Sequence, residues 1–225
     1  MTSSAADNRR MALAANLFVI LLLFSAIVAA CVIAPTEVTM GHSQRIVYVH
    51  VAVAWIGLAG FPFMAVAGFL YLRSRKITWD HWARAAGETS WICCSLTLIT
   101  GSLWAHEAWG TWWTWDPRLT TAFVLWLVYS GYLIVCGSLE DPHHRARIGA
   151  VLAIIGALEV PLVLSATRLF RGIHPASPQA EPIMRVVLLV SVVGFSAFFV
   201  WLMVFRKKQF AVEHRLARIE REIDA

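Results

Sequence analysis

Long apolar blocks are the feature that most constrains what this chain can form. Of its 225 residues, 59% are hydrophobic and only 15% are charged, whereas a soluble domain carries about 25% charged residues. Blocks of about twenty apolar residues are long enough to cross a bilayer as helices. Helices are required because lipid leaves the open edge of a sheet without hydrogen bonds. The sequence therefore predicts an all-α integral membrane protein with one domain, residues 1–225, and it excludes a separate soluble domain.

Six such blocks predict six transmembrane helices, at about residues 12–34, 46–72, 85–105, 119–139, 148–167 and 183–205. Positive residues near spans favour the cytoplasmic side. The outer side would hold five of the nineteen Lys and Arg residues, namely Arg45, Arg118, Arg168, Arg171 and Arg185. Both termini are therefore predicted to be cytoplasmic. We attribute the net charge of +5 to this topology rather than to a nucleic-acid partner.

Two segments at the chain's ends qualify this picture. Residues 206–225 alternate basic and acidic side chains, which predicts a charged cytoplasmic helix that continues the last span. The string Val28-Ala29-Ala30-Cys31 resembles a lipoprotein cleavage box, but the long apolar run around it favours an uncleaved anchor.

The predicted outer loop between the third and fourth spans is crowded with tryptophan. Residues 104–120 read W-A-H-E-A-W-G-T-W-W-T-W-D-P-R-L-T. An aromatic belt at a membrane surface needs one or two Trp at each helix end, so it does not explain this density. Gly110 and Pro117 argue against one uninterrupted helix. Rigid aromatic faces suit a flat apolar ring system. The candidate ligand-binding residues of this segment are Trp104, Trp109, Trp112, Trp113, Trp115 and Asp116.

Two histidines are predicted on the same side as this segment. His50 lies about one turn inside the second span, where an ionisable residue is a candidate functional site. Its small neighbours on the same helical face would admit either another helix or a planar ligand. His174 lies in the last outer loop, where a lone histidine is more often a surface residue.

Together, two neutral imidazoles can hold one haem iron from opposite sides. The haem propionates would then need cations, for which Arg45, Arg118, Arg168 and Arg171 are available. The chain has no C-x-x-C-H motif, so the pattern indicates non-covalent haem b rather than haem attached to this chain.

The string W-G-T-W-W-T-W-D-P-R-L-T resembles the WWD signature of the haem-handling proteins of cytochrome c biogenesis. The Arg-Leu-Thr after Trp-Asp-Pro is similar to the CcmC branch, whereas the larger CcmF and CcsA branches typically carry Lys-Glu there. This resemblance implies a haem platform on the periplasmic face of the bacterial inner membrane, which loads the haem chaperone CcmE. It also implies association with CcmA, CcmB and CcmD. His50 and His174 match the two outer histidines of that family.

Two other functions stay open at this point. One is a haem lyase, an enzyme that joins haem to apocytochrome c. The other is a transport subunit that moves haem across the bilayer. No nucleophile with a base and no phosphate-binding loop appears in the sequence, so we favour a non-catalytic haem-delivery protein.

Overall fold

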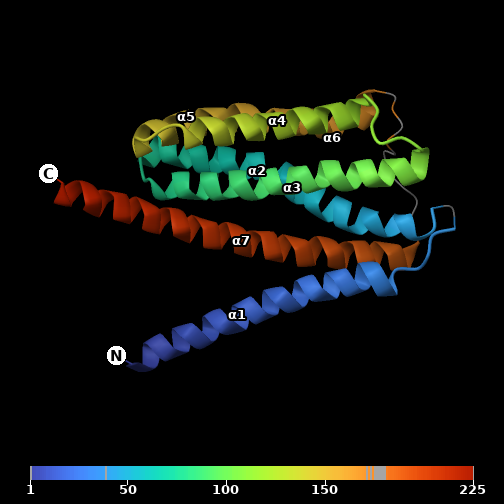
Figure 1. Cartoon of the computed structure of the whole chain (residues 1–225), viewed down its shortest axis with the longest axis horizontal. Helices are drawn as coiled ribbons and strands as arrows, with labels where there is room; N and C mark the ends of the chain where they lie inside the picture. The colour runs from blue at the N-terminus through green and yellow to red at the C-terminus, as the bar shows by residue number, and fades with distance from the viewer. Residues whose placement is uncertain (1, 39, 171, 173, 175–180, 225) are drawn as a thin grey trace.

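The computed structural model describes residues 2–38, 40–170, 172, 174 and 181–224, and these residues are almost entirely helical (Figure 1). This confirms the all-α class. The helices, in chain order, are α1 (Thr2–Val28), the π-helical turn η1 (Ala29–Ile33), the 3-10 turn η2 (His42–Gln44), α2 (Arg45–Ser74), α3 (Thr78–Trp109), α4 (Pro117–Gly137), α5 (Pro142–Ala157), α6 (Glu159–Leu169) and α7 (Pro182–Ile223).

Five helical segments of the described chain are long and apolar enough to cross a membrane. They are Arg9–Ile33, His42–Ser74, Pro117–Gly137, Pro142–Ala166 and Pro182–Ile223. The expected block at 85–105 lies in α3, which is as long as the others but richer in Thr, Ser and Trp. Figure 1 shows both termini at one end of the molecule and the α3–α4 connection at the other.

Two expected boundaries differ from the structure. Helix α3 continues to Trp109, so the first part of the Trp-rich segment is helical rather than looped. The block at 148–167 is two helices, because the chain breaks at Leu158 between α5 and α6. Pro161 explains this break: it has no N–H to donate, and its ring clashes with the carbonyl of the residue four positions earlier, Ala157.

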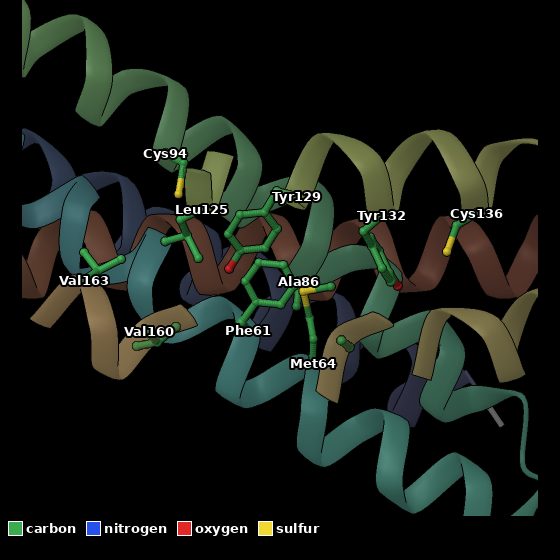
Figure 2. Packing of buried hydrophobic residues seen from close by; sticks show 11 residues of the cluster. Phe61, Met64, Ala86, Cys94, Leu125, Tyr129, Tyr132, Cys136, Val160 and Val163 are labelled. Atoms are coloured by element: carbon green, nitrogen blue, oxygen red, sulfur yellow. The ribbon is translucent and has the colours of Figure 1, made fainter. Parts of the chain in front are cut away.

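The core lies where α2, α3 and α4 meet. Phe61 of α2 stacks on Tyr129 of α4 with ring centroids 3.9 Å apart, and the Tyr129 hydroxyl donates to the Gly57 carbonyl at 2.8 Å. Figure 2 shows these rings side by side, with Met64 and Tyr132 pointing into the same layer. Gly60 permits this close approach, since a Cβ there would overlap Ser90 Oγ and Tyr129 Oη.

Replacing Gly60 with alanine is therefore expected to destabilise the helix bundle by about 1–3 kcal/mol, the usual cost of overpacking a close contact. Thermal unfolding of the purified chain in detergent, followed by circular dichroism, measures the effect. Gly131→Ala in α4 is the matched control, because a Cβ there meets nothing within 4 Å. Equal melting temperatures for the two variants would contradict the packing described here.

Candidate functional site

A small cavity lies at the end of the bundle that carries the α3–α4 connection. Side chains from α2, α3, α4 and α6 surround it, together with His174, which precedes α7. Its space is about 90 Å³. The residues that line it are His50, Ala54, Leu58, Cys94, Thr97, Leu98, Gly101, Ser102, Trp104, Ala105, Trp109, Trp113, Arg118, Leu119, Ala122, Leu125, Val163 and His174.

His50 reaches the cavity from α2 and is oriented by Thr100 of α3. The Nδ1 atom of His50 lies 3.1 Å from Thr100 Oγ1, and Thr100 Oγ1 itself donates to the Leu96 carbonyl at 2.6 Å. A hydroxyl has one proton, so Thr100 accepts from His50 and Nδ1 carries the imidazole hydrogen. The other ring nitrogen, Nε2, then keeps its lone pair. This is the tautomer that metal-ligating histidines adopt when a neighbouring group accepts their second N–H.

Gly101 explains how the imidazole fits against α3. A Cβ at this position would lie 2.9 Å from the Cε1 atom of His50. Only a residue without a side chain leaves that space open. The pair Thr100-Gly101 therefore both orients the His50 ring and makes room for it.

The Trp-rich segment is anchored at both of its ends. Gly110 ends α3 with a φ of 70°, a left-handed conformation that glycine adopts without strain. Asp116 begins α4 as its N-cap, accepting from the Arg118 backbone N–H at 2.8 Å, and Pro117 occupies the first helical position. Gly110 and Pro117 thus interrupt the helix where the sequence predicted an interruption.

The tryptophans divide into two groups. Trp104, Trp109 and Trp113 line the cavity, and the rings of Trp104 and Trp109 meet edge to face at 4.8 Å. Trp112 and Trp115 are exposed and lie outside it. Two contacts fix the position of Trp112. Its ring stacks on the His106 ring with the centroids 4.0 Å apart, and its backbone carbonyl accepts a hydrogen bond from the Ser102 hydroxyl at 2.7 Å.

A second, apolar groove adjoins the cavity on the outer side of α3 and α4. Its space is about 620 Å³. Trp113 lines both hollows and packs edge to face on Phe123 at 6.1 Å. The groove residues are Leu98, Ile99, Ser102, Leu103, Trp112, Trp113, Trp115 and Phe123. Leu98 and Ser102 line both hollows as well, so these two residues and Trp113 lie between the cavity and a broad apolar surface.

The structure brings together six of the predicted site residues in the cavity lining, namely His50, His174, Trp104, Trp109, Trp113 and Arg118. Of the other six, Trp112 and Trp115 line the outer groove, and four stand elsewhere or lie outside the described residues. Arg45 does not line the cavity, because its guanidinium donates to the Cys31 carbonyl. Arg168 is exposed on α6 and is also absent from the lining. Arg171 lies outside the described residues.

Asp116 is buried beneath the site rather than in its lining. A Cβ on Gly172 would overlap the Asp116 carboxylate, so Gly172, two residues before His174, lies directly against it. Asp116 thus joins the start of α4 to the chain that carries the second histidine.

Sequence reasoning missed Thr100 and Gly101, and also the cavity floor formed by Leu125 and Val163. A small residue beside a hydroxyl residue is common in membrane helices, so this pair carries no signal until α2 is placed beside α3. Leu125 and Val163 look like any lipid-facing aliphatic residue.

The chemistry of the lining fits an aromatic ligand that carries a metal and a negative charge. Two imidazoles supply nitrogen ligands, Arg118 supplies a cation, and three indoles supply flat apolar faces. Among the described residues, the buried Trp104 Nε1 has no hydrogen-bond partner, so it is available as a donor. Pockets for drug-sized ligands measure roughly 300–1,000 Å³, so a large ring must displace part of the lining.

Comparison with known proteins identifies the family. The family described as heme exporter protein C matches residues 3–222. The heme exporter protein C of Bradyrhizobium diazoefficiens is 32% identical over 177 residues, covering 76% of this chain and 67% of that protein. The heme exporter protein C of Rhodobacter capsulatus is 31% identical, covering 83% of this chain and 80% of that protein. The heme exporter protein C of Escherichia coli K12 is also 31% identical, covering 72% of this chain and 68% of that protein. The chain therefore belongs to the heme exporter protein C family.

Proposed function

We propose that this chain binds haem b at the cavity between His50 and His174 and delivers it to the haem chaperone CcmE during cytochrome c maturation. The site would face the periplasm from the bacterial inner membrane, and CcmA, CcmB and CcmD would complete the complex. One observation carries the proposal: two histidines from distant parts of the chain line one cavity with three tryptophans.

The lining residues would hold different parts of the haem. His50 Nε2 and the His174 imidazole are the iron ligands, and Trp104, Trp109 and Trp113 provide faces for the ring. Arg118 is the cavity's cation for a propionate. Because the cavity volume is about 90 Å³, loading requires the Trp-rich segment to move away from His50 and His174.

We infer a non-catalytic role, because the described lining offers nitrogen ligands, aromatic faces and a cation, which are the groups that hold a haem. Any ATP hydrolysis would belong to a partner subunit. A haem lyase would instead have to bring haem to the thiols of an apocytochrome.

Co-expression separates delivery from ligation. The chain is expressed with CcmA, CcmB, CcmD and CcmE, and in parallel with an apocytochrome c but without CcmE. Covalent haem on CcmE, detected by haem staining after denaturing electrophoresis, is the expected result. Haem attached to the apocytochrome in the absence of CcmE would show that the chain is a lyase and would overturn the proposal.

Replacing Thr100 with valine should weaken haem binding by about tenfold, because groups that orient a metal-ligating histidine are worth about 10–100-fold in affinity. Valine keeps the shape of threonine and removes the hydroxyl that lies 3.1 Å from His50 Nδ1. Haem titration of the purified chain, followed by the Soret absorbance, measures the change.

Thr97→Val is the matched control for Thr100→Val. Thr97 also lines the cavity, but its hydroxyl donates only to the Cys93 carbonyl of its own helix. Thr100→Ser should restore the affinity, since it returns the hydroxyl. Equal losses in Thr97→Val and Thr100→Val would contradict the orienting role of Thr100.

A further inference from the structure

Helix α7 extends well past the other helices. It runs for 42 residues, which corresponds to about 63 Å at 1.5 Å per residue, about twice the ~30 Å of the hydrocarbon layer. Figure 1 shows its C-terminal part projecting beyond α2–α6. We call residues 206–223 the C-terminal extension. Because the apolar part of α7 already accounts for a full crossing, the extension lies in water.

One face of the extension is fixed to the bundle. Arg206 forms an ion pair with Glu88 of α3, with Nη2 donating to Oε1 at 3.1 Å. The Phe210 ring lies between the guanidinium groups of Arg84 and Arg206, at 3.8 and 4.1 Å. Nearer the C-terminus, the His214 ring packs edge to face on the His81 ring of α3, with the ring centroids 5.6 Å apart. These contacts set the direction in which the extension projects.

A different face carries an apolar stripe that no described residue covers. Val212, Leu216, Ile219 and Ile223 are 54%, 54%, 48% and 77% exposed. Their spacings of four, three and four residues are those of the d and a positions of a heptad repeat. Gln209 takes the preceding a position, and a polar residue there is a common means of fixing register. The stripe is therefore the seam of a short coiled coil.

The charges beside this seam identify its partner. Lys208, Arg215 and Glu222 fall at the g positions, and Glu213 and Glu220 at the e positions. In a parallel pair of identical helices, each g residue meets the e residue five positions later on the other helix, so every such contact joins opposite charges. In an antiparallel pair, g would meet g and e would meet e, and each contact between the e positions Glu213 and Glu220 would join two negative charges.

Of the two expected contacts, Lys208 with Glu213 and Arg215 with Glu220, the second is the more informative. Glu213 already bonds to Arg206 of its own helix at 3.2 Å. Within the part of the chain that the structure describes, neither Arg215 nor Glu220 enters an ion pair. Both charges are thus available to a second helix. A shared bilayer also imposes the parallel orientation, because two copies insert the same way round.

We propose that the C-terminal extensions of two copies of this chain pair as a parallel, two-stranded coiled coil over residues 209–223. A segment of little more than two heptads makes a weak interface for free peptides. Here both helices are anchored in one membrane, and the contacts at Arg206 and Phe210 fix the direction in which each helix projects. Both constraints raise the effective concentration of one helix near the other. The extension is thereby an assembly surface that is separate from the cavity.

Disulfide cross-linking of the full-length chain in native membranes tests this pairing. Ile219→Cys places a thiol in the seam, whereas Arg221→Cys places one at the f position, away from the partner. The unsubstituted chain controls for its four natural cysteines. Mild oxidation should give a species of twice the chain's mass with Ile219→Cys, and several-fold less of it with Arg221→Cys or with the unsubstituted chain.

Charge reversal then tests the identity of the partner. In the Ile219→Cys background, Arg215→Glu alone or Glu220→Arg alone should reduce the dimer several-fold, and the two together should restore it. Restoration requires that both charges belong to copies of the same chain. Equal cross-linking at 219 and 221, no dimer at all, a product of another mass only, or a double reversal that fails to restore the dimer would each overturn the proposal.

Discussion

Replacing His50 with alanine is expected to abolish haem loading onto the chaperone. In the proposed haem site His50 is an iron ligand oriented by Thr100, and nothing else on α2 in the cavity lining can coordinate iron. Changing a group that merely supports a ligand costs about 10–100-fold in metal affinity, so losing the ligand itself should cost more than ~100-fold. Haem staining of CcmE and haem titration of the purified chain both measure this loss.

The cause of that loss can be separated from misfolding. Free imidazole added to His50→Ala should enter the vacated space and restore part of the haem binding. It supplies the same nitrogen ligand without a covalent link to the backbone of α2. His42→Ala is the matched control, since His42 lies at the same end of the molecule but outside the cavity lining. If His50→Ala loads the chaperone as well as His42→Ala does, His50 is not an iron ligand.

The second large effect is expected at Trp113. Its ring lines the cavity and the outer groove together, and it packs against both Trp115 and Phe123. Central aromatic anchors in binding sites contribute about 2 kcal/mol or more, so Trp113→Ala should weaken haem binding roughly 30-fold or more. The haem titration used for His50 measures it, and the axial-ligand spectrum of any bound haem should stay the same.

Two other tryptophans serve as controls for Trp113. Trp55 is exposed on α2 and belongs to neither hollow, so Trp55→Ala should leave the affinity unchanged. Trp115 lines only the groove, and its replacement should have a smaller effect than that of Trp113. Affinity losses of the same size for Trp55, Trp113 and Trp115 would mean that the aromatic segment acts through general stability rather than as a binding surface.

The sequence predicted most of the helices because their signals are local. An apolar block needs no tertiary context to indicate a membrane helix, and Gly110 and Pro117 interrupt a helix by their own backbone chemistry. The same holds for His50, which stands out as a lone ionisable residue in an apolar span. Its presence in one cavity with His174 and Arg118 is the part of the site that the structure adds.

The remaining features depend on contacts between distant segments. Arg45 was expected to face a ligand, but the nearby Cys31 carbonyl takes its guanidinium. Asp116 was expected in the lining, but it caps α4 and lies against Gly172. Thr100 becomes significant only when α2 places His50 within hydrogen-bond distance of it. Sequence periodicity reports which face of a helix is apolar and does not report which neighbour that face meets.

The central claim is that His50 and His174 hold one haem iron between them. Electron paramagnetic resonance and visible spectra of the purified, haem-loaded ferric chain test it most directly. We predict a low-spin, six-coordinate iron in the unsubstituted chain and a shift towards high-spin or altered ligation in both His50→Ala and His174→Ala. Spectra that are unchanged in both variants would contradict the account.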